Sequence, residues 1–111
     1  MPAIFITGAA SGIGRATAEL FHQKGWTIGL ADKDTAGLEQ VQQSMDKTRT
    51  CLLTMDVTDE SSVAAAFIKF NDFSGNNLDV LFNCAGILRM GDNSTISLAD
   101  QHLTMQINVG G

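Results

Sequence analysis

The sequence is poor in basic residues, contains only two cysteines and no tyrosine, and has no long apolar run. Its seven Lys and Arg residues stand against 12 Asp and Glu residues, and the net charge of −5 disfavours binding to the phosphates of nucleic acids. No apolar run approaches the roughly 18 residues that a membrane-spanning helix requires, and no basic, signal-like leader precedes the first apolar segment. We therefore expect a cytoplasmic protein that binds neither nucleic acid nor membranes.

The two cysteines are expected to be core residues. Cys51 and Cys84 both lie inside apolar runs, where an unpaired cysteine commonly packs as a small hydrophobic side chain. The 111 residues are 44% hydrophobic, and a chain of this size can bury roughly two thirds of its unfolded surface. These features predict one domain, or one piece of a domain, with both thiols free.

Hydrophobic periodicity predicts strands that alternate with helices. Apolar runs typical of strands begin at Ala3, Trp26, Arg49 and Leu78, and segments with helical spacing lie between them. The last of these runs, LDVLFNCAG, has no polar alternation at its centre, as expected for a parallel strand that helices cover on both faces. The pattern predicts an α/β fold: a doubly wound (Rossmann) parallel sheet with helices on both faces, truncated after about four strands.

Several helix ends can be predicted from local signals. Gly25 is expected to terminate the first helix in a left-handed conformation. Thr58 is expected to cap the third helix, with Asp59 among the acidic residues of its positive first turn. A final helix is expected to begin at Ser97 and to remain unfinished near Asn108.

The first strand leads directly into a glycine-rich stretch, TGAASGIG, at residues 7–14. A glycine-rich turn between a strand and a helix directs backbone N–H groups and the positive helix end at one point, which forms a site for a phosphate. The alternative is a turn that merely needs glycine for positive φ. Asp32 favours a ligand, because it ends the second strand 18 residues after Gly14, where a dinucleotide-binding fold places a carboxylate against the adenosine ribose.

The glycine stretch has the spacing T-G-x-x-x-G-I-G, and together with three further motifs it resembles the short-chain dehydrogenase/reductase family, in its classical branch. The further motifs are Asp56-Val57 after the third strand, NCAG at residues 83–86, and SLADQHLTMQINV at residues 97–109. Cys84 departs from the N-A/N-A-G pattern of the family. Four motifs in the family's order are far more specific than a glycine loop alone.

The resemblance implies a nicotinamide cofactor, hydride transfer to or from a small alcohol or carbonyl substrate, the strand order 3-2-1-4, and a homo-oligomer for the full-length protein. NAD is expected rather than NADP, because the carboxylate of Asp32 would repel a 2′-phosphate, an effect that the neighbouring Lys33 would partly offset. No metal site is predicted. The residues expected to bind the cofactor are Gly8, Ser11, Gly12, Ile13, Gly14, Asp32, Asp56, Val57, Asn83, Ala85 and Gly86.

Two of these residues also have structural interpretations. Asp56 is alternatively a carboxylate at a strand end that faces water. Asn83 is alternatively a side chain that satisfies backbone groups between strands, a role that is compatible with contact to the cofactor.

The absence of tyrosine bears on catalysis. The resemblance implies a proton-donating tyrosine four residues before a lysine, with a serine nearby, and Asn108 is the one catalytic position that this chain matches. We therefore expect residues 1–111 to be the N-terminal, cofactor-binding part of a single Rossmann domain whose catalytic part is absent, and to be inactive alone. The alternatives are a non-catalytic dinucleotide-binding module, and a half-fold that pairs with another chain through an unprotected fourth strand.

Overall fold

The computed structural model describes residues 2–84, 88–90, 94–96 and 104–107, and strands and helices alternate as predicted over residues 3–83. The strands are β1 (Ala3–Thr7), β2 (Thr27–Asp32), β3 (Thr50–Thr54), β4 (Val80–Asn83), β5 (Leu88–Met90), β6 (Ser94–Ile96) and β7 (Thr104–Ile107). The helices are α1 (Gly12–Gln23), α2 (Thr35–Gln42) and α3 (Glu60–Ser74).

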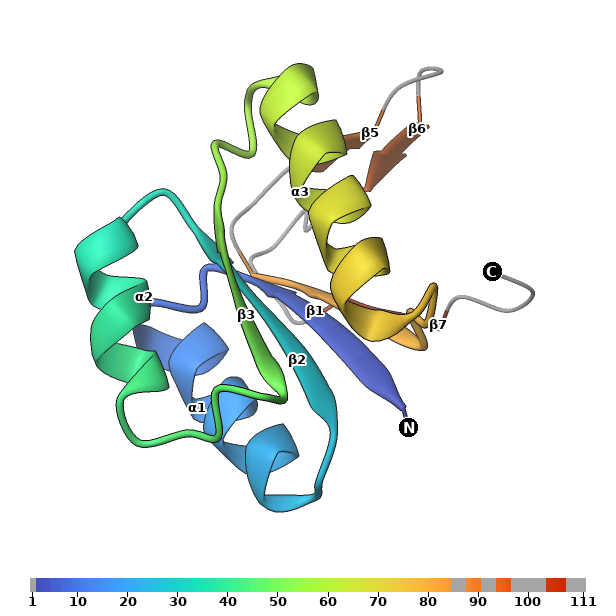
Figure 1. The fold of residues 1–111 in the computed structure, drawn as a ribbon. Helices are drawn as coiled ribbons and strands as arrows, with labels where there is room; N and C mark the ends of the chain where they lie inside the picture. The colour runs from blue at the N-terminus through green and yellow to red at the C-terminus, as the bar shows by residue number, and fades with distance from the viewer. Residues whose placement is uncertain (1, 85–87, 91–93, 97–103, 108–111) are drawn as a thin grey trace.

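The main sheet has the order β3-β2-β1-β4-β7. Its first four strands are parallel to one another, which confirms the predicted strand order and the α/β class. Helices α1 and α2 cover one face of this sheet and α3 covers the other (Figure 1). Because β1 lies between β2 and β4, the chain reverses its direction of winding at β1, and the carboxyl ends of these strands form the crevice where such folds bind ligands.

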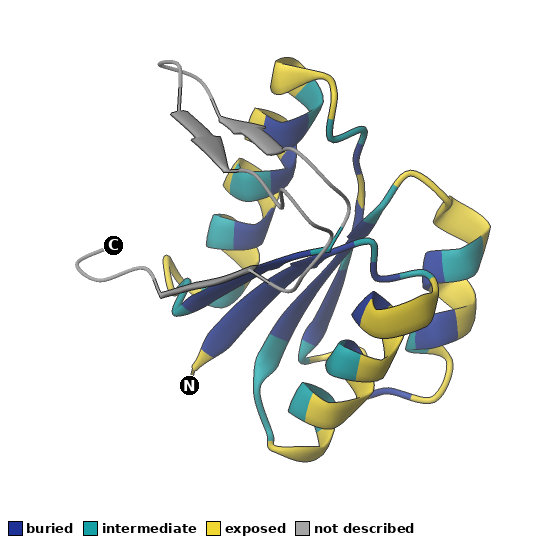
Figure 2. Ribbon diagram, turned by 180° about the vertical axis from the view of Figure 1, so that it is seen from behind, coloured by how far each residue is buried: buried dark blue, intermediate teal, exposed yellow. Residues whose placement is uncertain are grey.

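The core consists of two apolar layers, one on each face of the sheet. All five residues of β1 are buried, and their side chains alternate between the two layers. On the α3 side, Phe5 stacks on Phe67 with ring centroids 4.1 Å apart and meets the edge of Phe70 at 5.6 Å. Figure 2 shows the buried strands between helices whose outer faces are exposed. Burial on both faces makes the central strands a rigid support for their carboxyl ends.

The prediction of a final helix is wrong at Thr104–Ile107. This segment forms β7, which pairs antiparallel with β4 from Asn83↔Thr104 to Val80↔Ile107. Its sequence, TMQI, alternates polar and apolar residues as a strand does, and the outer backbone groups of β4 provide the partners. The expectation that β4 is an unprotected edge is therefore also wrong. The start of the predicted helix, residues 97–103, lies outside the described residues.

The helix ends agree with the predictions at α1 and differ by one residue at α3. Gly25 follows α1 with φ 84°, and its N–H donates to the carbonyl of His22 while Trp26 N–H donates to Phe21, both at 3.1 Å, which confirms the predicted stop. At α3 the cap is Asp59, not Thr58, because the Asp59 carboxylate accepts the N–H of Ser61 at 3.0 Å.

Two features are absent from the described part of the chain. None of its helices has the length and hydropathy of a membrane span. Within the same residues, no group of three His, Cys, Asp or Glu side chains is placed to hold a metal ion. Cys51 is buried and Cys84 half-buried, and both are free thiols.

Candidate functional site

The glycine turn joins the buried end of β1 to the start of α1. A β-carbon on Gly14 would collide with the carbonyl group of Gly8, so glycine at this position lets α1 pack directly against the turn. Gly12 differs, because its backbone is left-handed at φ 61° and a β-carbon there would meet no described atom within 4 Å. The turn is therefore closed at Gly14 and open to solvent in front of Gly12.

In the part of the chain that the structure describes, no side-chain cap hydrogen bond is made at the N-terminus of α1. Ser11 occupies the cap position with extended backbone, but its side chain makes no cap hydrogen bond to the described residues, and the first turn holds no acidic residue. The first N–H groups of a helix have no partner within the helix and carry the positive end of its dipole. Free donors at a helix N-terminus beside open space, as at Gly12, are the arrangement that binds a phosphate.

Asp32 ties the glycine turn to the end of β2. One carboxylate oxygen accepts the N–H of Ala10 and the other accepts the N–H of Asp34, each at 3.1 Å. In addition, Ala9 N–H donates to the carbonyl of Ala31 at 3.0 Å. The half-buried Asp32 carboxylate is thus held by the backbone in one orientation beside the turn.

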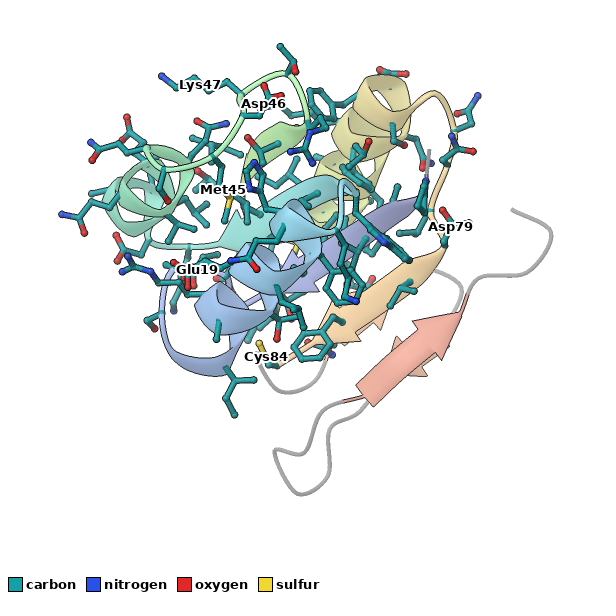
Figure 3. The ribbon with its side chains drawn as sticks, turned by 90° about the horizontal axis from the view of Figure 1, so that it is seen from below. Glu19, Met45, Asp46, Lys47, Asp79 and Cys84 are labelled. Atoms are coloured by element: carbon teal, nitrogen blue, oxygen red, sulfur yellow. The ribbon has the colours of Figure 1, made fainter. Side chains whose placement is uncertain are left out.

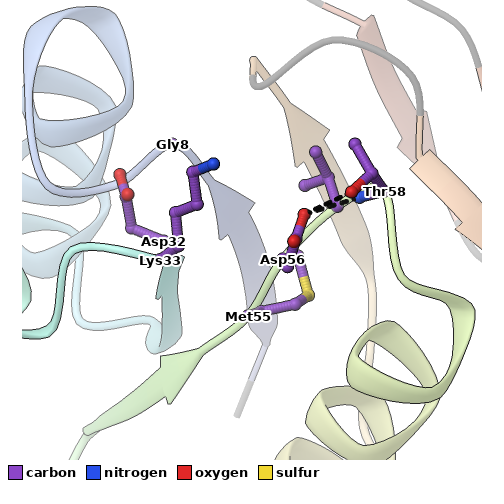
Figure 4. A pocket seen from close by; sticks show the side chains of 7 residues that line it. Gly8, Asp32, Lys33, Met55, Asp56 and Thr58 are labelled. Carbon is purple, nitrogen blue, oxygen red and sulfur yellow. Dashed lines mark hydrogen bonds between the residues drawn. The ribbon is translucent and has the colours of Figure 1, made fainter.

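A hollow of about 250 Å³ lies between the ends of β2 and β3 and the glycine turn (Figure 4). Asp32 and Lys33 stand on one side of it and Asp56 on the other. Its lining residues are Gly8, Asp32, Lys33, Met55, Asp56, Val57 and Thr58. The hollow therefore combines two carboxylates and one ammonium group at the carboxyl end of the sheet.

Asp56 is oriented by the residues that follow it. Its carboxylate accepts the hydroxyl of Thr58 at 2.7 Å and the N–H of Thr58 at 2.9 Å. These two hydrogen bonds, with a smaller contribution from the Lys33 ammonium, lower the pKa of the Asp56 carboxyl below its ordinary value of 3.8. Asp56 is consequently a fixed negative charge at neutral pH.

Asn83 lies beneath the turn, at the end of β4. Its side chain is fully buried and its oxygen accepts the hydroxyl of Thr7 at 2.6 Å. The same hydroxyl accepts Cys84 N–H at 3.0 Å, and the Cys84 thiol donates to the carbonyl of Thr7 at 2.7 Å. Figure 3 shows Cys84 at this end of β4 and Asp79 at the other. This network joins β1 to β4 where the turn begins.

The Cys84 thiol is kept in its neutral form. Burial raises its pKa, and the negative charge of Asp32 raises it further. A protonated thiol is the form that can donate to the Thr7 carbonyl, and its sulfur occupies the space that β-carbons on Gly8 or Gly14 would approach to 3.2 and 3.0 Å. Cysteine at this position is therefore compatible with the glycine turn.

The comparison with protein families decides the assignment. The model of the family described as short chain dehydrogenase matches residues 2–111, which is nearly the whole sequence. The chain belongs to the short-chain dehydrogenase family.

Named members of the short-chain dehydrogenase family extend well beyond this chain. The D-threitol dehydrogenase of Mycolicibacterium smegmatis is 35% identical over 108 residues, which are 96% of this chain and 41% of the relative. Short-chain dehydrogenase reductase 5 of Arabidopsis thaliana is 34% identical over 109 residues, 97% of this chain and 42% of the relative. An uncharacterized oxidoreductase of Staphylococcus haemolyticus is 36% identical over 84 residues, 76% of this chain and 36% of the relative. The chain thus spans about two fifths of their length.

Solved short-chain dehydrogenase structures contain the same fold. The 3-ketoacyl-(acyl-carrier-protein) reductase of Brucella melitensis, crystallised in complex with NADH, superimposes with a TM-score of 0.68 at 30% identity, over 72% of this chain and 32% of that one. A short-chain dehydrogenase of unknown function from Caenorhabditis elegans, solved with its cofactor, gives 0.68 at 28% identity, over 72% and 31%. The described fold is therefore that of the N-terminal part of these proteins.

The structure brings most of the predicted site residues of this short-chain dehydrogenase to one end of the sheet. Gly8, Asp32, Asp56 and Val57 line the hollow. The others that are described lie in the glycine turn and the start of α1 (Ser11, Gly12, Ile13, Gly14) or beneath the turn (Asn83). Ala85, Gly86 and Asn108 lie outside the described residues.

Sequence reasoning did not include Met55 and Thr58 in the site, although both line the hollow. It treated Lys33 only as a charge next to Asp32, and Thr58 as a helix cap. The signal for Thr58 was available, since a threonine two residues after an aspartate commonly donates to its carboxylate in a tight turn. Asp56 is half-buried, and the completely buried Asn83 side chain accepts the side-chain hydroxyl of Thr7.

Proposed function

We propose that this chain is the dinucleotide-binding part of an NAD-dependent oxidoreductase, which transfers a hydride between nicotinamide and a small alcohol or carbonyl substrate. The observation that carries the proposal is the uncapped N-terminus of α1 beside the open space at Gly12, with Asp32 fixed by two backbone N–H groups next to it. This is one site with a place for phosphate and a place for ribose. The bound nicotinamide would supply the hydride chemistry.

Each part of the cofactor has residues of matching chemistry. The first N–H groups of α1, at Gly12 and Ile13, would bind the pyrophosphate, with Ser11 and Gly14 shaping the turn. Asp32 would accept hydrogen bonds from the ribose hydroxyls, and the Asp56-Val57 pair would border the adenine. Asn83 would support the site indirectly, because its hydrogen bond with Thr7 holds the ends of β1 and β4 together.

NAD is favoured over NADP by charge. A 2′-phosphate about 4 Å from the Asp32 carboxylate would be repelled by on the order of 4 kcal/mol per charge pair at an effective dielectric of 20. Lys33 lines the same hollow and would offset part of this repulsion. We expect NADH to bind at least tenfold more tightly than NADPH.

The remaining roles are proposed from family membership. Ala85 and Gly86 would continue the cofactor site after β4, and Asn108 would be a catalytic residue. The complete protein is proposed to be a cytoplasmic homo-oligomer, of which residues 1–111 form the N-terminal part of one Rossmann domain. The catalytic serine, tyrosine and lysine would come from sequence that this chain does not contain.

The proposal is tested on the longest natural form of the protein and on residues 1–111 alone. Calorimetric titration with NADH and NADPH at fixed salt measures cofactor choice, and a panel of alcohols and carbonyls tests turnover. We expect NADH to bind the long form and turnover to be confined to it. Binding without turnover of any substrate by the long form would favour the non-catalytic module, and failure to bind either dinucleotide would refute the site.

A further inference from the structure

The outer edge of β3 is covered by side chains from both flanking helices. Arg49 and Met55, which flank β3, bond to β2 through backbone groups, so in a parallel ladder residues 50, 52 and 54 direct their backbone groups away from β2. Such outward groups can pair with a strand of another molecule. The contacts made at these three positions decide whether this edge is open.

At the first two of these positions, Thr50 and Leu52, a long polar side chain donates a hydrogen bond to the carbonyl group. The amide nitrogen of Gln42 donates to the carbonyl of Thr50 at 3.1 Å and to its hydroxyl at 2.9 Å. The ammonium group of Lys69 donates to the carbonyl of Leu52 at 3.2 Å. Gln42 comes from α2 on one face of the sheet and Lys69 from α3 on the other, so the edge is held from both sides (Figure 1).

At the third position, Thr54, the contact is between side chains and involves the other end of α2. The hydroxyl groups of Thr35 and Thr54 are 2.7 Å apart. Thr35 begins α2 and Gln42 ends it, so the helix runs antiparallel to β3 and contacts both ends of the strand. The helix and the strand have similar lengths. From Thr35 to Gln42 the helix rises about 10 Å, and from Thr50 to Thr54 the strand rises about 13 Å.

We propose that Gln42 and Lys69 keep the β3 edge closed to strand addition by a second copy of this chain. An incoming strand would place its N–H groups on the carbonyls of Thr50 and Leu52, where it would compete with the Gln42 amide and the Lys69 ammonium group. On the other side of the sheet β7 pairs with β4 and is itself the edge strand. This inference is independent of the proposed function, because neither Gln42 nor Lys69 lines the hollow.

The test replaces both donors by an unbranched apolar side chain, in the double variant Gln42→Met with Lys69→Met of the longest natural form. The matched control is Gln40→Met with Lys24→Met, which makes the same change of composition and charge at exposed positions on α2 and after α1. Sedimentation velocity measures self-association, and hydrogen exchange measures protection of the Leu52 N–H as concentration rises. We expect self-association at least tenfold stronger than in the control, with exchange at Leu52 slowed at least tenfold.

Association equal to that of the control would overturn the proposal, as would association without added protection at Leu52. If the double variant does not fold, Lys69→Met and Lys69→Arg are compared instead. Arginine keeps a donor for the Leu52 carbonyl, so we expect only the methionine variant to associate more strongly than the unaltered protein. Equal behaviour of these two variants would also overturn the proposal.

Discussion

The N-termini of α1 and α3 are built in opposite ways. At α3, the Asp59 carboxylate accepts the N–H groups of Ser61 and Ser62, and Glu60 adds a second negative charge in the first turn. At α1, the side chain of Ser11 makes no such bond to the described residues, and the first turn contains Gly12, Ile13 and Gly14 without an acid. A helix end whose N–H groups already have acceptors gains little from binding an anion. A helix end whose N–H groups lack acceptors and border open space is suited to bind one.

The largest expected effect is that of a side chain at Gly12. Gly12→Val should weaken NADH binding at least a hundredfold, because the branched side chain would enter the open space in front of α1. Gly75→Val is the matched control, since Gly75 also has a left-handed backbone, at φ 69°, with no described atom near a β-carbon. Both changes should lower the free energy of unfolding by about 1–2 kcal/mol. Calorimetric titration and urea unfolding measure the two effects.

The comparison would fail if the Gly12 and Gly75 variants bound NADH equally well. Such a result would mean that glycine at position 12 serves only its own backbone conformation, and that α1 does not bind the pyrophosphate.

Asp32→Ala should reduce the preference for NADH over NADPH at least tenfold. The change removes the charge that repels a 2′-phosphate and leaves Lys33 in the hollow. Asp72→Ala, at an exposed position of α3, is the control for the loss of one negative charge. Competition titrations at constant ionic strength measure the ratio, and an unchanged ratio would assign the discrimination to other residues.

The two helix caps should differ in what they contribute to stability. Asp59→Ala should lower the free energy of unfolding by about 1 kcal/mol, since it removes the acceptor for two backbone N–H groups. Ser11→Ala should change it by a few tenths of a kcal/mol at most, because the Ser11 side chain makes no cap bond. Equal losses in urea unfolding would show that the two helix ends are equivalent.

The smallest effect concerns the turn that leads into α3. Thr58→Val removes the hydroxyl that donates to Asp56, so the pKa of the Asp56 carboxyl should rise toward 3.8, as followed by carbon-detected NMR. Because the folded-state pKa is lowered, the stabilisation by Asp56 is complete above pH 3.8 and is lost as the pH falls through the lowered value. Thr58→Val should therefore shift acid unfolding to slightly higher pH.

Thr48→Val is the matched comparison for this effect. Thr48 makes the same two hydrogen bonds to Asp46, whose lowered pKa also has a contribution from Arg49. The rise of the carboxyl pKa should be seen at Asp56 in one variant and at Asp46 in the other, and a common rise at both sites in either variant would point to a global change of the fold.

Local patterns in the sequence determined much of this protein. The apolar runs and helical spacing predict the four parallel strands and three helices, because burial on both faces of a parallel strand demands such runs. The glycine turn and the stop at Gly25 follow from the conformations that glycine alone adopts readily. Asp32 could be placed at the end of a strand beside the turn because consecutive parallel strands end at the same edge of the sheet.

Only the tertiary structure decided the features that depend on neighbours distant in sequence. Thr104–Ile107 has spacing compatible with either a helix or a strand, and its pairing with the outer side of β4 makes it β7. The buried Asn83 side chain accepts a hydrogen bond from Thr7, which is 76 positions away in the sequence. Lys69 of α3 donates to the Leu52 carbonyl, and no pattern in the sequence indicates that contact. Periodicity specifies which face of an element is buried, but the partner of a backbone group at a sheet edge depends on which strand or side chain the completed fold brings there.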